Sequence, residues 1–144
     1  MPGDSLLTML NAAAVAVAHA DLRSCCASLR WATEVLAQRP FASLTEVEEV
    51  SAAVLATLDW SDVLDALADL PGVSAAGGDL ARGDAIYRER FGHGFVVCAS
   101  GMSAGAVLSA LRRRLGHDRA TERAVVRAEL ARIVARRLRR LASR

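Results

Sequence analysis

The chain has 144 residues and a net charge of +2 at pH 7, with 53% hydrophobic but only 4% aromatic residues. This length suits one domain over residues 1–144, with a core built from Ala, Leu and Val. Because Ala and Leu favour helices whereas sheet interiors favour β-branched and aromatic residues, the composition predicts an all-α fold. No apolar run reaches the roughly 20 residues that span a bilayer, so no membrane partner is expected.

The N-terminal apolar stretch and the cysteines indicate a reduced, cytoplasmic setting. Residues 6–18 are apolar, but Asp4 is the only charged residue before them, so they lack the basic start of a secretion signal. Cys25, Cys26 and Cys98 cannot all pair with one another, and neighbouring cysteines rarely bridge.

Three helices are predicted before residue 40. Asp4 or Ser5 is a suitable N-cap for a first helix that runs to about Ala18. A third helix contains Trp31 and ends before Pro40, because the residue preceding a proline avoids helical backbone angles. Between them, a short second helix would carry Leu22, Cys25, Cys26 and Leu29.

Two further helices are predicted up to residue 72. Ser43 and Glu46 form a capping box, in which the hydroxyl and the carboxylate accept hydrogen bonds from unpaired amides at a helix start. The next helix begins near Asp59 and ends at Pro71-Gly72. The apolar positions of these two helices have helical spacing and are Val47, Val50, Val54, Leu55 and Leu58, then Val63, Leu64, Leu67 and Leu70.

The second half of the chain alternates irregular segments with helices. Residues 71–79 are predicted to be the least regular part. A helix over residues 80–91 follows, and the apolar run 95–98 is too short to assign by periodicity and suits a buried extended segment.

The last two helices complete an expected bundle of about seven or eight helices. Ser103 is expected to cap a helix through Leu115, with Gly116 as its C-terminal residue. The final helix covers about residues 119–141 and carries on one side Val126, Leu130, Ile133, Val134, Leu138 and Leu141.

The charge is unevenly distributed along the chain. Residues 112–144 contain twelve Arg against three acidic residues (+9), whereas the other residues contain six Arg against thirteen acidic residues (−7). The positive charge of residues 112–144 would allow binding to nucleic acid or to an acidic partner. It would equally allow the last helix to lie across the protein's own acidic helices or against a second copy. We favour an intramolecular or solvated role over nucleic-acid binding, because no aromatic stacking residues accompany the arginines.

The chain contains no signature of a nucleotide-binding loop, a zinc protease or a nucleophile elbow. His19, His93 and His117 are far apart in sequence, so no metal site is predicted. Cys25 and Cys26 would point about 100° apart on a helix, which does not suit chelation, and we interpret them as core residues.

One short motif places a titratable histidine between two glycines, which allow the backbone to turn. His93 lies between Gly92 and Gly94, and the apolar run that follows it ends at Cys98. Glycine permits the close approach of a ligand, and His titrates near neutral pH. The alternative, an exposed histidine in a turn, is favoured when this motif is considered by itself.

The order of several short motifs along the chain is more informative. In sequence these are Cys25-Cys26-Ala27-Ser28 with Trp31, Arg39-Pro40-Phe41, Asp59-Trp60, Asp69-Leu70-Pro71, Tyr87, Phe91-Gly92, the run Phe95 to Ala99, Gly101, Ser103, the run Arg114 to Gly116, and Thr121-Glu122-Arg123. In this order they resemble the 2-oxo-4-hydroxy-4-carboxy-5-ureidoimidazoline (OHCU) decarboxylases, which complete the conversion of urate to (S)-allantoin. The resemblance implies an all-helical bundle, often a homodimer, that uses no cofactor or metal.

The resemblance fails at residues that carry the family's chemistry. The essential His-Pro pair of the family reads Leu70-Pro71 here, and Leu cannot donate, accept or carry a proton. The family's Asn-Gly-Arg-Ser, whose Arg binds the anionic end of the substrate, reads Ser100-Gly101-Met102-Ser103, and Met102 cannot pair with a carboxylate.

A third family feature is also missing, whereas the pocket wall remains. The chain between Pro71 and Phe91 is too short for the family's substrate-contacting helix with its Ser-x-x-Glu-Gln-like motif. Phe95 and Val97, whose backbone groups hold the ligand in the family, are retained. Because losing a general acid or base alone costs about 10²–10⁴ in rate, efficient turnover of the urate-pathway substrate is the least expected function.

We therefore expect a repurposed, cofactor-independent lyase, cyclase or dehydratase that acts on a larger, more apolar small molecule in the old pocket, for example in secondary-metabolite biosynthesis. The alternative is a non-catalytic binding or scaffolding protein that uses the old pocket or the Arg-rich C-terminal helix. The candidate catalytic residues are His93, Cys98 and Asp69. The candidate substrate-binding residues are Leu70, Pro71, Phe95, Val97 and Met102.

Overall fold

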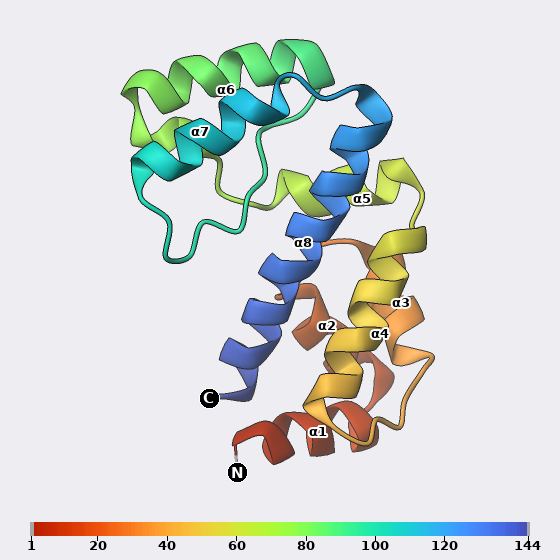
Figure 1. The fold of residues 1–144 in the computed structure, drawn as a ribbon. Coiled ribbons are helices and arrows are strands. Elements are labelled where there is room, and N and C mark those ends of the chain that lie inside the picture. Colours follow the sequence, from red (N-terminus) through yellow and green to blue (C-terminus); the bar gives the residue numbers. More distant parts are fainter. Residues whose placement is uncertain (1, 144) are drawn as a thin grey trace. The chain divides into compact units, whose positions relative to one another are not determined.

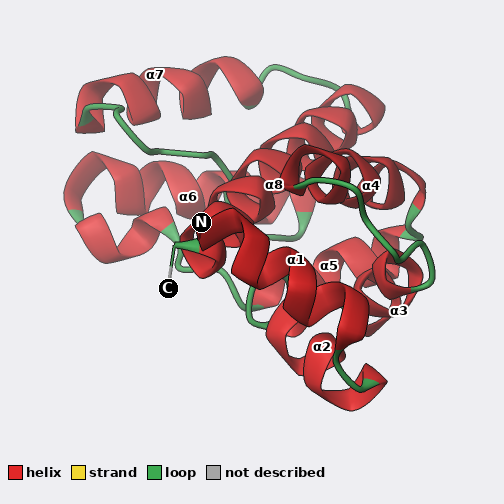
Figure 2. Ribbon diagram, turned by 90° about the horizontal axis from the view of Figure 1, so that it is seen from below, coloured by secondary structure: helices red, strands yellow, loops and turns green. Residues whose placement is uncertain are grey.

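A computed structural model describes residues 2–143, with side chains from residue 6 onward, and shows helices joined by loops (Figures 1 and 2). In chain order the elements are α1 (Pro2–Ala12), α2 (Val15–Arg23), α3 (Leu29–Leu36), α4 (Leu44–Thr57), α5 (Trp60–Ala68), the 3-10 helix η1 (Val73–Ala76), α6 (Gly78–Phe91), α7 (Ala104–Arg114) and α8 (Arg119–Ala142). The described residues contain no strand, which confirms the predicted all-α fold.

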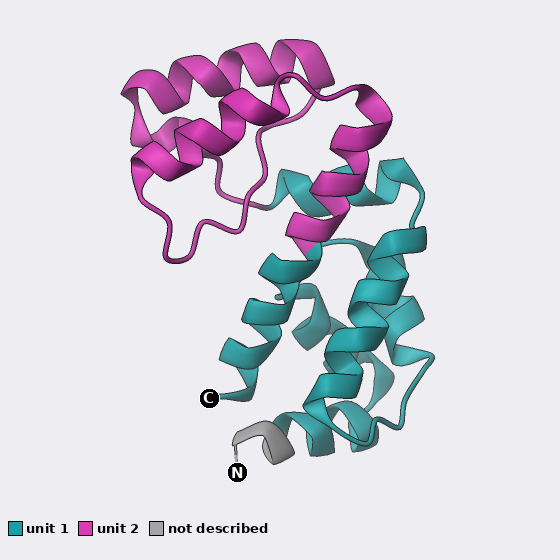
Figure 3. Cartoon of the chain, in the orientation of Figure 1, with its two compact units in different colours: residues 1–69, 131–144 teal, residues 70–130 magenta. Residues whose placement is uncertain are grey.

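The chain divides into two compact units (Figure 3). Unit 1 comprises Met1–Asp69 and Ala131–Arg144, and unit 2 comprises Leu70–Leu130. Helix α8 therefore gives its first half to unit 2 and its second half to unit 1. The single domain expected over residues 1–144 stays a prediction.

Helix α3 is central to unit 1, where it contacts α2, α4 and α5, while α1 contacts α4. Trp31 of α3 is fully buried, and its indole N–H donates to Ser51 Oγ of α4 at 3.1 Å. The second half of α8 adds Val134 and Leu138, both fully buried. Each such aliphatic side chain stabilises the fold by roughly 1.5–3 kcal/mol relative to an exposed one.

The predicted first helix to Ala18 is wrong, because the chain breaks between α1 and α2. One Nη atom of Arg39 donates to the carbonyl oxygens of Leu10 at 3.2 Å and Ala13 at 2.9 Å, which satisfies groups left unpaired at the end of α1. Helix α1 also begins at Pro2, before the expected caps, and the side chains of Asp4 and Ser5 lie outside the described residues.

The predicted second helix is also misplaced. Helix α2 ends at Arg23, so Cys25 and Cys26 lie in the turn that follows it, and Leu29 opens α3. Ser28 caps α3 by accepting a hydrogen bond from the Trp31 amide, which separates the two helices. Both cysteines are buried, which confirms their interpretation as core residues, and burial raises the pKa of the Cys26 thiol to about 11.

The capping box before α4 is confirmed. Ser43 Oγ accepts from the Glu46 amide at 3.1 Å, and the Glu46 carboxylate accepts from the Ala42 amide at 2.9 Å. The predicted ends of two other helices are corrected: α5 stops at Ala68, before Leu70, and α7 ends with Leu115 as its C-cap.

In the second half, one segment differs in detail from the prediction and another agrees with it in part. Residues 71–79 are not wholly irregular, since they contain the 3-10 turn η1 and the start of α6. Residues 95–98 form neither helix nor strand, and Phe95 and Val96 are buried. The burial of these two residues agrees with the buried segment that the apolar run suggested, and its extended conformation stays a prediction.

Unit 2 has its own hydrophobic core between α6, α7 and the segment that joins them. The buried members of this core are Tyr87, Phe95, Val107, Ala110 and Leu111. Within the described part of the chain, every helix is too short or too polar to span a membrane.

We predict that Ser43→Ala lowers the free energy of unfolding by about 1 kcal/mol, because the Glu46 amide loses its only capping acceptor. Urea denaturation followed by circular dichroism measures this change. Ser109→Ala is a matched control, since Ser109 is exposed within α7 and Ala is the better helix former there. An equal loss in both variants would contradict the capping role.

Candidate functional site

Most of the sequence-predicted site residues lie on the segment that joins α6 to α7 in unit 2. Gly92 ends α6 with a φ of 85°, a left-handed conformation that glycine adopts without strain. His93 is half-buried, and its ring lies edge-on to Tyr87 with 5.4 Å between the centroids. His93 Nδ1 lies 2.9 Å from the Gly94 carbonyl oxygen, which only accepts, so Nδ1 is the donor in this hydrogen bond.

A buried aspartate on α6 fixes the start of this segment. Asp84 is fully buried, and its Oδ1 accepts from the Phe95 amide at 2.8 Å. Its Oδ2 accepts from Arg88 Nε at 2.9 Å and from the Ser74 hydroxyl. Burial opposes the charged form, but these hydrogen bonds outweigh it and lower the pKa of Asp84 below its usual value.

A buried ion pair between α7 and α8 lies beside the same segment. The side chains of Arg114 and Glu122 are 3% and 1% exposed, and Arg114 Nη2 lies 2.7 Å from Glu122 Oε2. Glu122 also accepts from the Tyr87 hydroxyl, and its Oε1 lies 3.1 Å from His117 Nδ1. Burial alone would raise the pKa of Glu122, but the hydrogen bonds from Arg114 and Tyr87 hold it below the usual value.

The same arginine and a glutamate of α8 fix the rest of the segment. Arg114 Nη1 donates to the Val96 carbonyl oxygen at 2.6 Å, and its guanidinium carbon lies 4.3 Å from the centroid of the Phe95 ring. Glu129 Oε2 accepts from the Cys98 amide at 3.0 Å. Charged groups of α6, α7 and α8 therefore hold the backbone of this segment at Phe95, Val96 and Cys98.

Val97 differs from its neighbours in this segment. Its half-buried side chain packs with Met102 against the core of unit 2. Among the described residues, neither its backbone N–H nor its C=O has a hydrogen-bond partner. A backbone donor and acceptor held rigidly and left unpaired can bind the complementary pair of a small molecule.

The structure brings five of the predicted residues onto this one segment, which carries His93, Phe95, Val97, Cys98 and Met102. Leu70 and Pro71 open unit 2 and are half-buried and exposed, respectively. Leu70 does not extend the apolar stripe of α5, because that helix has already ended. Asp69 belongs to unit 1, where its exposed carboxylate lies 4.0 Å from Arg137.

Sequence reasoning missed the charged groups that position the segment. Arg114 and Glu122 were part of the motif order that carried the family resemblance, but nothing local marks them as buried, since Arg114 ends a run of three arginines. Asp84 and Glu129 belong to no recognised motif. The described residues contain no cluster of three His, Cys, Asp or Glu side chains arranged to hold a metal ion.

Comparisons with known proteins agree with this fold. The OHCU decarboxylase family matches residues 11–79 and 74–139. A crystal structure of OHCU decarboxylase in the presence of (S)-allantoin superposes with a TM-score of 0.76 and 22% identity, covering 85% of this chain and 96% of that one. A crystal structure of (S)-allantoin synthase gives a TM-score of 0.77 and 20% identity, covering 94% of this chain and 53% of that one. No curated protein matches the sequence.

We predict that Glu122→Gln lowers the free energy of unfolding by about 3–5 kcal/mol, because Arg114 would remain buried without a counter-charge. Urea denaturation at pH 7 measures the change. Glu48→Gln removes the same charge from the exposed pair with Arg139 and should cost at most about 1 kcal/mol. Similar losses in both variants would show that burial of the Arg114–Glu122 pair carries no special energy.

We also predict acid lability that originates in unit 2. Folding lowers the pKa values of Asp84 and Glu122, so both carboxylates stabilise the folded state. Their full contribution to the free energy of unfolding is present above the unfolded pKa values, 3.8 and 4.5. It is lost as the pH falls through the lower pKa values of the folded state. The urea midpoint should be nearly constant from pH 7 to about 5 and then fall. Asp84→Asn should lower the midpoint at pH 7 and flatten the fall, whereas an unchanged slope would exclude Asp84 as its source.

Proposed function

Because this chain belongs to the OHCU decarboxylase family, we propose that it is a repurposed member, which binds a small and weakly charged molecule along residues 95–98 and transforms it without a cofactor. The proposed reaction class is that of a lyase, cyclase or dehydratase, and the proposed setting is a biosynthetic pathway such as that of a secondary metabolite. The substrate is larger and more apolar than that of the urate pathway.

The observation that carries this proposal is the rigid backbone at Val97. Three buried or half-buried charged side chains, from Asp84, Arg114 and Glu129, hold the residues on either side of it. The Val97 N–H and C=O themselves make no hydrogen bond to described residues. A preorganised donor and acceptor bind a cyclic amide or a similar group without ordering any side chain.

The side chains around this backbone support a less polar ligand. Met102 packs with Val97 against the unit 2 core, and a thioether offers neither charge nor a strong hydrogen bond. Leu70 stands where the family has its essential His, so that group is absent as an acid or base. Selectivity for the ligand at this site therefore comes from the shape of the side chains and from the N–H and C=O of Val97.

The proposed acid–base group is His93. Its Nδ1 lies 2.9 Å from the Gly94 carbonyl oxygen and its ring makes a T-shaped contact with Tyr87, so Nε2 is the ring nitrogen to which we assign proton transfer. Cys98 is half-buried on the same segment and is a second candidate. Asp69 lies in unit 1, is exposed and pairs weakly with Arg137, which makes it the weakest of the three.

A non-catalytic binding protein is the second candidate function. The same Val97 backbone would hold its ligand, and the positioning charges described above need no chemistry to explain them. The family resemblance also supports a homodimer, and the three free cysteines support a reduced, cytoplasmic environment. A homodimer in the cytoplasm is therefore part of the proposed function.

We predict that the purified protein does not accelerate the conversion of freshly generated OHCU into (S)-allantoin, followed by circular dichroism against the spontaneous rate. The proposed binding site at the Val97 backbone, in contrast, should still bind (S)-allantoin, the uncharged compound in whose presence the decarboxylase structure was obtained. Titration with (S)-allantoin should shift the amide NMR signals of Val97 and Cys98 in a saturable manner. Acceleration of OHCU decay would contradict the loss of the old activity, and the absence of these shifts would contradict the backbone site.

The two candidate functions are distinguished by His93→Ala. Metabolite extract is incubated with the wild-type protein and with the variant, and mass spectrometry follows which compounds disappear. If the wild type depletes a compound and the variant depletes it about 10²-fold more slowly or worse, the result supports a catalytic His93. Retention of a compound on both proteins with depletion by neither supports the binding protein. Cys26→Ser, which alters a buried thiol of unit 1, controls for general damage.

A further inference from the structure

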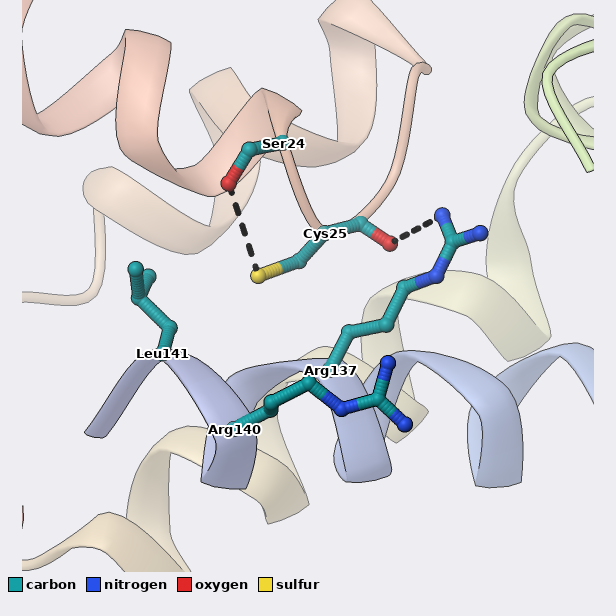
Figure 4. Close-up of a pocket in the computed structure, with 5 residues that line it drawn as sticks. All are labelled: Ser24, Cys25, Arg137, Arg140 and Leu141. Atoms are coloured by element: carbon teal, nitrogen blue, oxygen red, sulfur yellow. Dashed lines mark hydrogen bonds between the residues drawn. The ribbon is translucent and has the colours of Figure 1, made fainter. Parts of the chain in front are cut away.

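A second small-molecule site is indicated by a pocket that lies wholly within unit 1 (Figure 4). Its volume is about 150 Å³. Ser24 and Cys25, in the turn after α2, form one side, and the last turns of α8 form the other with Arg137, Arg140 and Leu141. The α8 residues are spaced by three and four positions, so they share one face of the helix. None of these residues takes part in the proposed function.

The arginines of this pocket are poorly neutralised. Arg139 of the same helix donates twice to the Glu48 carboxylate, at 2.7 and 3.0 Å. In contrast, among the described residues the only acidic partner of Arg137 is the exposed Asp69, at 4.0 Å, and the hydrogen bond from Arg137 to the Cys25 carbonyl oxygen is long, at 3.4 Å. Arg140 has no acidic partner among the described residues. The pocket therefore carries positive charge that its own wall does not balance.

The opposite wall offers little to a polar ligand. The Cys25 amide donates to the Leu22 carbonyl at 2.9 Å, and the Ser24 hydroxyl donates to the Asp21 carbonyl at 2.6 Å. Those donors are already used, and the Cys25 thiol lies 4.0 Å from the Ser24 hydroxyl, so this side offers a ligand mainly van der Waals contact with the Cys25 side chain. Together with Leu141 it gives the pocket an apolar portion. Charge recognition is left to the two guanidinium groups.

We propose that this pocket binds a small organic carboxylate of about the size of benzoate. A guanidinium matches a carboxylate with two parallel hydrogen bonds, and the apolar portion of the pocket receives the hydrocarbon body of the same molecule. An apolar cavity of roughly this volume holds one benzene molecule. Inorganic phosphate would pair with the arginines but would leave the contacts with Cys25 and Leu141 unused.

Benzoate is the probe that tests this assignment on the full chain. Titration with sodium benzoate, at constant ionic strength set with sodium chloride, should shift the amide NMR signals of Ser24, Cys25 and Leu141 along a saturable curve. Arg137→Gln and Arg140→Gln should each weaken the affinity by about tenfold, because each removes a charge-assisted hydrogen bond. Arg140 is exposed, so its variant keeps the fold, which circular dichroism verifies.

Arg139→Gln is the matched control, since it removes the same charge from the same turn of α8 but not from the pocket. It should leave benzoate affinity within about twofold of the wild-type value. Benzamide, which has the same shape without the charge, should not bind.

Several outcomes would overturn the proposal. Equal weakening by Arg139→Gln and Arg140→Gln would show only a general attraction of the basic helix for anions. Equal binding of benzamide would show an apolar site without charge recognition. Saturable binding of inorganic phosphate with no binding of benzoate would exclude a carboxylate ligand, and a linear response to benzoate would exclude a site.

Discussion

The buried guanidinium–carboxylate pair of Arg114 and Glu122 is the interaction on which unit 2 depends. Removing two opposite charges from water is costly, and the pair is stable only because further groups complete its hydrogen bonding. Tyr87 of α6 donates to the carboxylate, burial raises the pKa of this tyrosine so that it remains a donor, and the Val96 carbonyl accepts from the guanidinium. A single pair thus ties α6, α7 and α8 to the segment that carries the candidate site.

This network also accounts for part of the motif order by which the family is recognised. Tyr87, Arg114 and Glu122 contributed to the recognisable motif order, yet in the structure they hold helices together. Leu70 and Met102, which the sequence analysis singled out as departures from the family, are half-buried and take no part in the network. Part of the family resemblance therefore rests on residues that the packing of unit 2 requires.

Local signals were predictable from the sequence, whereas interactions between distant residues were not. The capping box of Ser43 and Glu46 was recognised because both partners lie within four residues. The break after α1 was missed because Arg39, far along the chain, supplies the donor that ends the helix. Likewise His93 was named from its flanking glycines, and Phe95 and Val97 from the family resemblance. The burial of Asp84, which accepts from the Phe95 amide, depends on how α6 packs and leaves no trace in its neighbours along the chain.

The division of α8 between the two units has a consequence for how such a protein can be inherited. Unit 2 is one uninterrupted stretch of chain, but unit 1 is made of two stretches that flank it. The buried residues Val134 and Leu138 complete unit 1 only after the whole of unit 2 has been translated. Recombination therefore cannot transfer unit 1 as one contiguous gene segment without carrying unit 2 with it.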